Sequence, residues 1–506
     1  MNDITAAIAG LKELDETVTR LGHVAALLEW DQETYLPEKA IEERSNQVAM
    51  IMGLHHEKVV DPSWESLFVE LGYDGGGGPD GVDEIDNAFL RESYKRWKKK
   101  AKVPKRLVEE MARVTSISQA AWASARKADD FTAFAPHLRK VLDLEKEYAL
   151  IVNPDADPYD TLLDEYEPGA KGDEIADLFD GLAAGLDDLL RKIQSGNRPP
   201  SSFLEKPYSV AKQNEFGKIV QQYMGYDTHR GRLDLSTHPF TTTLGPDDVR
   251  VTTRYDENLV LSGLFSNIHE AGHGLYEQGV GRSLRGTILA DGTSLGIHES
   301  QSRFWENVVG RSRPFWNKWY PEFSRLFAEN LETVDVGTFY RAVNQVRPSL
   351  IRVEADEVTY SFHIIIRFRL ERALLAGDLT VEDLPEAWRE SYRDLLGITP
   401  SNDADGCLQD VHWSVGLIGY FPTYALGNLY AAQFTRAMEN ELGPLGDLVA
   451  DDRIGKVLGW LRKNIHSHGR VYLPGELCRR VTGAELDPGY FLDYLNAKYS
   501  EVYQPS

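Results

Sequence analysis

Two histidines and a glutamate stand close together in the run His269-Glu270-Ala271-Gly272-His273. On an α-helix, residues four apart lie on one face, so His269 and His273 can bind the same metal ion. Glu270 follows the first histidine and projects to the side, where it can reach a water on the ion without binding the ion. This arrangement is typical of a zinc peptidase. The alternative is a helix that happens to carry two histidines.

The segment around this motif has the apolar spacing of a helix from Leu264 to Gln278. Gly272 and Gly274 weaken such a helix by about 1 kcal/mol each relative to alanine. We therefore expect these two glycines to serve close packing near the site.

The third ligand distinguishes between classes of zinc peptidase. Tyr276 and Gly279 stand where a metzincin needs glycine and histidine, which excludes that class. Glu277 lies eight residues beyond the first histidine, about 12 Å along a helix, which is too far for one ion. We expect Glu299, which opens a second helix after a glycine-rich connection, to be the third ligand. Glu306 is the competing candidate.

Two histidines, one glutamate and an open fourth position indicate a catalytic zinc site rather than a structural one. Zinc would lower the pKa of a water toward about 7 and polarise the scissile carbonyl. Glu270 would act as general base and then as general acid toward the leaving amine. Cobalt would fit the same ligands. No G-x-S-x-G run indicates serine catalysis, and Cys407 and Cys478 are the only thiols.

The composition is that of a globular protein, with 42% hydrophobic and 26% charged residues. The chain contains no run of about 18 apolar residues, so no membrane span is predicted. The N-terminus lacks the pattern of a signal peptide, and two cysteines fit a reducing compartment, so a cytoplasmic location is expected. The net charge of −24 disfavours nucleic acid or an anionic membrane as a partner.

One basic run, Lys95-Arg96-Trp97-Lys98-Lys99-Lys100, departs from this acidic balance. Lys102, Lys105 and Arg106 extend it, and Pro104 interrupts it before another predicted helix. We interpret the run as a solvated helix end rather than a binding patch.

Most of the chain has helical periodicity, which predicts an all-α fold. Four consecutive glycines within 72–81 predict a flexible loop. Helices are predicted from the start of the chain and over 107–128, 131–152, 172–195, 215–223, 336–375 (interrupted at Pro348) and 445–465.

The exception is the stretch 237–255, which predicts a small β-hairpin directly before the zinc helix. Two β-rich runs, 240–244 and 249–253, flank the turn signal Gly245-Pro246-Asp247-Asp248. In zinc peptidases such a strand can lie along the cleft and pair with the substrate backbone. A purely structural hairpin is the alternative.

Several further motifs resemble those of the carboxypeptidase Taq family of thermostable metallocarboxypeptidases, in order and over nearly the whole chain. These motifs are His238-Pro239-Phe240, Asp248-Val249-Arg250-Val251-Thr252, the zinc helix with His269, Glu270 and His273, His298-Glu299-Ser300-Gln301, Ile351-Arg352-Val353-Glu354-Ala355-Asp356, and Gly406-Cys407-Leu408-Gln409-Asp410-Val411-His412-Trp413.

The resemblance implies an almost wholly helical single fold with a deep central cleft, a metal at its floor, and usually a homodimer. It implies a single domain over 1–506, in which about 1–200 walls the cleft and about 201–506 forms the catalytic core. It also implies removal of single C-terminal amino acids with broad side-chain tolerance. By similarity the metal ligands are His269, His273 and Glu299, and the base is Glu270.

An exopeptidase must recognise a free carboxylate, and a buried arginine does so with paired hydrogen bonds. Arg352 is the first candidate and Arg250 the second. The alternative for each is a structural ion pair, with Asp356 for Arg352 and Asp248 for Arg250.

The tetrahedral oxyanion of peptide hydrolysis also needs a hydrogen-bond donor. His412 and Tyr424 are suitable residue types in matching motifs, and Tyr420 is a weaker candidate. His466 and His468 lie far downstream and are expected at the surface or in an interface.

The leading hypothesis is a zinc carboxypeptidase that acts on peptides. An oligopeptidase with the same ligands, which cuts internal bonds, is the second hypothesis. The third is a catalytically silent helical protein with a structural metal. Glu270 argues against the third, because a structural site has no use for an unliganded carboxylate beside the ion.

Overall fold

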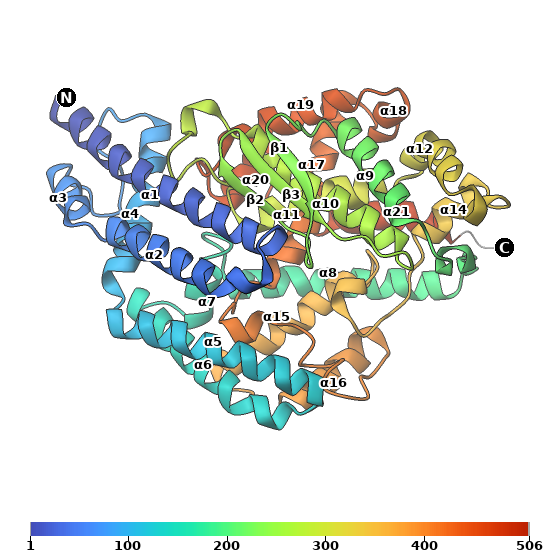
Figure 1. The fold of residues 1–506 in the computed structure, drawn as a ribbon, viewed down its shortest axis with the longest axis horizontal. Coiled ribbons are helices and arrows are strands. Elements are labelled where there is room, and N and C mark those ends of the chain that lie inside the picture. The colour runs from blue at the N-terminus through green and yellow to red at the C-terminus, as the bar shows by residue number, and fades with distance from the viewer. Residues whose placement is uncertain (1, 504–506) are drawn as a thin grey trace.

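The computed structural model describes residues 2–503 and is built almost wholly of helices around one small sheet (Figure 1). Met1 and residues 504–506, the ends of the predicted 1–506 domain, lie outside the described part. The all-α prediction with a small sheet beside the zinc helix is confirmed. None of the described helices carries an apolar stretch long enough to span a bilayer.

Long helices form the first part of the chain, in which α1 and α2 cross one side of the molecule and α5 and α6 run along another (Figure 1). The bounds are α1 (Asn2–Thr34), α2 (Ile41–Val59), α3 (Pro62–Glu70), α4 (Glu84–Lys102), α5 (Lys105–Ala128), α6 (Phe131–Val152), α7 (Pro158–Leu163) and α8 (Gly172–Gln194). Helix α8 shows why these segments fold: Ile175, Phe179, Leu182 and Leu186 recur at helical spacing and are all buried.

The sheet lies next to the helix that carries the histidine motif. Its strands are β1 (Gly231–Leu235), β2 (Thr241–Gly245) and β3 (Asp248–Thr253), and the flanking helices are α9 (Val210–Met224) and α10 (Val260–Gly279). The strand order is β1-β3-β2, with β2 antiparallel and β1 parallel to β3. The predicted hairpin is therefore present, and β1 adds a strand that the sequence analysis did not predict.

The middle of the chain begins with two elements that pack against α10. Its elements are α11 (Leu295–Arg303), the π-helical η4 (Phe304–Gly310), α12 (Arg313–Leu326), α13 (Ala328–Leu331), α14 (Val336–Val343), the 3-10 turn η5 (Arg352–Glu354), α15 (Tyr360–Ala376) and α16 (Leu384–Leu396).

The last part of the chain lies in the upper half of the view in Figure 1, and its first helix packs against α11. It contains α17 (Pro422–Leu442), α18 (Leu445–Ala450), α19 (Ile454–Asn464), α20 (Pro474–Thr482) and α21 (Gly489–Val502). Short 3-10 turns complete the chain: η1 (Glu38–Ala40), η2 (Ser202–Glu205), η3 (Arg282–Leu284), η6 (His412–Val415) and η7 (His466–His468).

The break predicted at Pro348 is present but wider than expected, and two other predicted helix bounds were wrong. The expected helix 336–375 is two helices, α14 and α15, because residues 344–359 form an irregular segment in which Asp356 accepts backbone hydrogen bonds. The expected helix 445–465 is divided between α18 and α19. Helix α11 begins at Leu295, four residues before Glu299, because the Ser294 side chain caps it.

His466 is not a surface residue, contrary to the sequence-based expectation. It is fully buried, and its Nε2 lies 2.8 Å from Oε1 of Gln301. Its ring also packs against Tyr276 of α10. His466 therefore helps to pack the back of the histidine helix.

Candidate active site

Helices α10 and α11 bring two imidazoles and a carboxylate together. One ligand atom from each of His269, His273 and Glu299 can be chosen so that all three lie within 4.8 Å of one another. Oε2 of Glu299 lies 3.5 Å from Nε2 of His269 and 3.4 Å from Nε2 of His273. We call these three residues the metal-ligand cluster.

Glycines let the three helices around this cluster approach closely. A Cβ atom on Gly272 of α10 would lie 2.8 Å from the Cα of Ser302 on α11. A Cβ atom on Gly427 of α17 would lie 2.5 Å from Cγ of Glu299. Gly274 is similarly close to Tyr226 and Val251. Close packing therefore accounts for Gly272 and Gly274, as the sequence analysis expected.

The outer nitrogen of His269 is held by a second carboxylate. Its Nδ1 lies 2.9 Å from Oε2 of the buried Glu306, on η4. If Nδ1 carries the proton and donates to Glu306, the lone pair of Nε2 faces the cluster. Glu306, the competing third ligand in the sequence analysis, thus lies beside His269 and is not part of the cluster.

A longer relay holds His273. Its Nδ1 lies 2.5 Å from Nδ1 of His298, and Nε2 of His298 lies 2.7 Å from Oε1 of Glu277. Thr243 of β2 donates to the other oxygen of Glu277 at 2.9 Å. A proton on Nε2 of His298 and another on Nδ1 of His273 satisfy both bonds and leave Nε2 of His273 free to bind a metal.

Arg303 holds the carboxylate of Glu299. Its Nε donates to Oε1 of Glu299 at 2.7 Å, so Oε2 is the oxygen that faces the histidines. Arg303 also pairs with Glu306 at 3.3 Å, and its guanidinium lies 4.4 Å from the ring centroid of Tyr360. One arginine therefore orients both carboxylates.

Glu270 stands beside the cluster and is not part of it. It is 7% exposed, and its Oε2 accepts a hydrogen bond of 2.7 Å from the hydroxyl of Thr241 on β2. Burial raises the pKa of its carboxyl. The hairpin before the helix thus orients the side chain that is predicted to be the base.

The surroundings of His273 and Glu299 favour the ionisation states that a cation needs. Burial lowers the pKa of His273 to about 3, so its imidazole is neutral. Burial acts against ionisation of Glu299, but Arg303 and the two histidines together outweigh it and hold the pKa of Glu299 well below its usual range. Two imidazole nitrogens and one carboxylate oxygen form a donor set that suits a divalent ion. These residues therefore fit a bound metal.

A cavity of about 1180 Å³ opens over the cluster. His269, Glu299, Arg303 and Glu306 line its floor side, and the irregular segment 344–359 lines another side. None of the residues that line it comes from 1–200. Helix α1 instead faces Phe240 and Thr241 of the hairpin across a separate cavity of about 430 Å³.

Arg352 lines the large cavity and is 6% exposed. It donates to Oδ1 of Asp410 from Nε at 3.0 Å and from Nη2 at 2.8 Å, and its Nη1 donates to the hydroxyl of Tyr360 at 3.2 Å. One N–H on Nη1 and one on Nη2 remain available for a substrate. Two such donors on one guanidinium can bind both oxygens of a carboxylate. The sequence-based alternative of an ion pair with Asp356 is wrong, because the partner is Asp410.

Asp410 joins Arg352 to a second buried arginine, Arg367, whose Nη2 lies 2.6 Å from Oδ2. The two arginines outweigh burial and hold the pKa of Asp410 well below its usual range. Nδ1 of His412 lies 3.9 Å from Oδ1 of the same carboxylate. We call Arg352, Arg367, Asp410 and His412 the arginine cluster.

His412 and Tyr424, the predicted oxyanion donors, lie together. Nε2 of His412 is 3.2 Å from the hydroxyl of Tyr424, and Tyr424 lines the large cavity. The guanidinium of Arg352 lies 4.9 Å from the Tyr424 ring centroid. Burial raises the pKa of Tyr424, so its hydroxyl stays a donor. Tyr420 packs between Tyr166 and Tyr424 and is not among the lining residues.

Arg250 lies elsewhere. On β3 it forms a paired ion bridge with Asp248, with both N–O distances 2.8 Å. Its guanidinium lies 4.1 Å from the ring centroid of Trp30 on α1. It does not line the large cavity. The structure therefore has the ion pair that was the alternative for Arg250.

Sequence reasoning gave no role to several residues that complete the site. Arg303 follows Glu299 by four residues, a spacing that signals an ion pair on a helix. His298 and Asp410 lie inside quoted motifs, but their partners are 21 and 58 residues away in the chain. Thr241 gave no signal, because the strand that carries it meets α10 only in the folded chain.

The chain is similar to known proteins over nearly its whole length. A profile of the family described as carboxypeptidase Taq (M32) metallopeptidase matches residues 10–499. Thermostable carboxypeptidase 1 of Thermus thermophilus is 45% identical over 98% of this chain and 99% of its own.

Solved structures give the same picture. The M32 carboxypeptidase of Deinococcus radiodurans has a TM-score of 0.94 at 40% identity, covering 98% of this chain and 99% of its own. Metallocarboxypeptidase 1 of Trypanosoma cruzi has a TM-score of 0.90 at 30% identity, with 98% and 99% covered.

Proposed function

The chain belongs to the carboxypeptidase Taq (M32) family of metallopeptidases, and from this premise we propose that it is a zinc-dependent carboxypeptidase of broad specificity that releases single C-terminal residues from peptides. The observation that carries the proposal is the metal-ligand cluster at the base of a large cavity, with the unliganded carboxylate of Glu270 beside it.

His269, His273 and Glu299 would hold the ion, and zinc suits these ligands best, with cobalt able to replace it. When bound, such an ion polarises a carbonyl and makes a water more acidic. The residues behind the cluster set the direction of each ligand: Glu306 for His269, His298 for His273 and Arg303 for Glu299.

Glu270 moves the proton. Since its Oε2 accepts the Thr241 hydroxyl, Oε1 is the oxygen left to take a proton from the attacking water. The raised pKa of a buried carboxyl helps it to keep that proton until the leaving amine accepts it. Thr241 limits the rotation of the side chain and so keeps Oε1 directed.

Arg352 binds the substrate's terminal carboxylate through the two N–H groups that Asp410 and Tyr360 leave open. Arg367 shares Asp410 and keeps that carboxylate ionised, which fixes the guanidinium of Arg352. Tyr424 donates to the developing oxyanion, and His412 orients its hydroxyl. Arg250 has no role in this scheme beyond tying β3 to α1.

The residues that line the cavity come from elements spread over 201–499, which supports a single catalytic core over about 201–506. In this proposal residues 1–200 support the cavity from outside rather than line it. A homodimer, a cytoplasmic location, and the lack of nucleic-acid or membrane partners stay predictions from the sequence.

Mass spectrometry of a short peptide incubated with the metal-loaded protein tests the proposal, beside the same peptide with a C-terminal amide. We expect a ladder of single-residue losses from the free C-terminus only. Internal cuts in both peptides would make the protein an oligopeptidase and would contradict the role of Arg352. Metal analysis of the purified protein tests whether zinc is the ion.

A further inference from the structure

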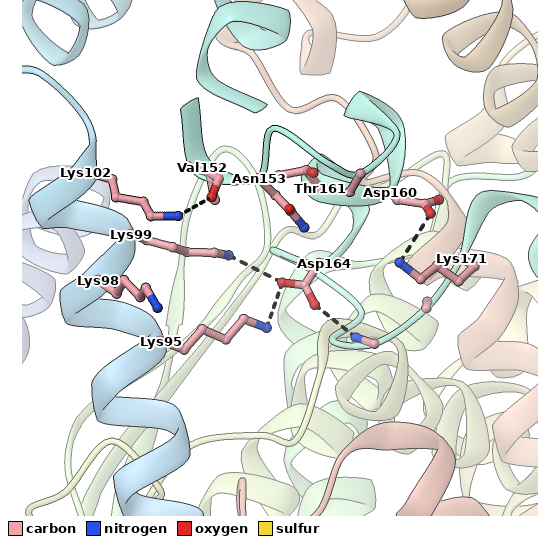
Figure 2. Close-up of a pocket in the computed structure, with 13 residues that line it drawn as sticks. Lys95, Lys98, Lys99, Lys102, Val152, Asn153, Asp160, Thr161, Asp164 and Lys171 are labelled. Carbon is pink, nitrogen blue, oxygen red and sulfur yellow. Dashed lines mark hydrogen bonds and ion pairs between the residues drawn. The ribbon is translucent and has the colours of Figure 1, made fainter. Parts of the chain in front are cut away.

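Four lysines of α4 line one wall of a cavity far from the active site in sequence (Figure 2). Lys95, Lys98, Lys99 and Lys102 follow the spacing of one helix face, so their side chains reach the same space. Lys171 faces them from the opposite side of the cavity, as Figure 2 shows. We call these five residues the lysine pocket.

The lysine pocket has the size of a small-molecule site. Its volume is about 330 Å³, within the range of about 300–1,000 Å³ that ligand pockets occupy. Asn153 and Thr161 add polar groups to the lining. The sequence analysis interpreted the basic run as a solvated helix end, whereas its lysines surround a concave space.

Carboxylates only partly neutralise these ammonium groups. Lys95 and Lys99 share Asp164, at 2.7 and 3.5 Å, and Lys99 also reaches Glu165 at 2.7 Å. Lys171 pairs with Asp160 at 3.3 Å.

The other two lysines form no ion pair with a carboxylate of the described residues. Lys102 donates to the backbone carbonyl of Val152 at 2.9 Å, and Lys98 lies 4.9 Å from the ring centroid of Tyr94. Five ammonium groups thus face three carboxylates, an excess of positive charge in a chain whose net charge is −24. Burial alone would raise the pKa of Asp164, but Lys95 and Lys99 lower it. This lowered pKa is consistent with a positive local potential.

The segment 164–171 connects the lysine pocket to the active site. At one end Asp164 is bound by the lysines, and its Oδ1 also accepts the backbone N–H of Gly169. Between these two residues, the carbonyl of Tyr166 accepts the N–H of Leu295, and Glu167 accepts the N–H of Gly296.

Those two bonds fix the first turn of α11, the helix that carries Glu299. The ring of Tyr166 also packs against Tyr420, whose own ring contacts Tyr424. These contacts form a continuous connection from Asp164 to both a predicted metal ligand and a predicted substrate-binding residue.

We infer that the lysine pocket binds a compact, multivalent anion that carries phosphate groups, and that this anion regulates the peptidase. Lysine ammonium groups bind phosphate as point charges, and several of them together favour a multivalent anion over a monovalent one. The bound anion competes with Asp164 for Lys95 and Lys99, and the loosened segment 164–171 lowers turnover.

Isothermal titration of the metal-loaded protein with inorganic pyrophosphate tests the site. The informative variant combines Lys98→Ala and Lys102→Ala, because these substitutions break no ion pair with a carboxylate. The matched control is Lys100→Ala, which removes an exposed lysine of the same helix that lies outside the pocket. We expect the wild type and the control to bind one pyrophosphate, and the double variant to bind about tenfold or more weakly.

Absence of binding by the wild type, or equal binding by all three proteins, would overturn the site. Sulfate at matched ionic strength should bind more weakly than pyrophosphate, and equal binding would overturn the assignment to multivalent phosphates. Turnover, measured with excess buffered metal, should fall with pyrophosphate in the wild type and the control but not in the double variant. Because removal of the metal by pyrophosphate would inhibit all three equally, equal inhibition would overturn the regulatory link.

Discussion

The metal-ligand cluster and the arginine cluster bring charged side chains to the same cavity by different means. In the metal-ligand cluster, two ligands are four residues apart on α10, and the third lies on the next helix. In the arginine cluster, Arg352 lies in the irregular segment 344–359, and its carboxylate partner Asp410 is 58 residues further along the chain.

This difference separates two ways of fixing a functional group. The backbone hydrogen bonds of a helix fix the positions from which its side chains project. The metal-ligand cluster therefore needs its neighbours only to set ring orientation and proton positions. An irregular segment fixes little by itself, so Arg352 depends on Asp410, and Asp410 in turn on Arg367. We therefore expect changes in the arginine cluster to spread further than changes around the metal.

The largest effect should follow a change at Glu270, beside the metal-ligand cluster. Glu270→Gln keeps the shape and the bond to Thr241 but removes the proton acceptor, so kcat should fall by about 10²–10⁴-fold. Metal content should stay the same, because Glu270 is not a ligand. Steady-state kinetics and metal analysis of the purified variant check this. A variant that keeps wild-type kcat would rule out Glu270 as the base.

A change in the arginine cluster should mainly affect substrates with a free C-terminus. Arg352→Gln removes the predicted carboxylate partner, and kcat/KM for such peptides should fall by about 10²–10³-fold. Metal content should not change, since Arg352 forms its ion pair with Asp410 and not with a predicted metal ligand.

Arg250→Gln is the matched control, because both arginines bind an aspartate and only Arg352 lines the cavity. We expect the control to change kcat/KM less than about threefold, as for a partly exposed ion pair. Equal losses in the two variants would mean that Arg352 has no special role in binding the carboxylate.

The relay behind His273 tests how far the metal-ligand cluster depends on its neighbours. His298→Ala removes the partner of His273 Nδ1, and metal affinity should weaken by about 10–100-fold. Thr243→Val breaks only the bond to Glu277, one step further away, and should have a smaller effect. Competition with a chromogenic chelator measures both affinities. The reverse order of effects would mean that the relay does not act through His273.

The same contrast explains what the sequence could predict. The two histidines of α10 and the carboxylate of Glu299 follow from helical spacing and the order of elements, and helical periodicity gave the all-α fold. Strand β1 was missed because its pairing with β3 is set by the folded chain and not by local pattern. Asp356 was considered as the partner of Arg352 because it is near in sequence, but it is used by backbone N–H groups instead.

The smallest expected effect concerns the pH dependence of stability, and it arises in the arginine cluster. Burial, followed by the charge of Arg352, lowers the pKa of His412 to about 4, whereas an unfolded histidine has a pKa of about 6.5. Between these values the unfolded chain binds the extra proton and the folded chain does not. Stability therefore falls as the pH is lowered through this window, and it does not depend on His412 above about pH 6.5.

His412→Gln removes this titration, so its free energy of unfolding should fall less than that of the wild type between pH 7 and pH 5. At pH 5 the difference in that fall should be about 2 kcal/mol. Urea unfolding of both proteins at the two pH values measures it. An equal fall in both proteins would mean that His412 is already protonated in the fold. The arginine cluster would then tolerate a third positive charge beside Asp410, and its dependence on that single carboxylate would be weaker than we infer.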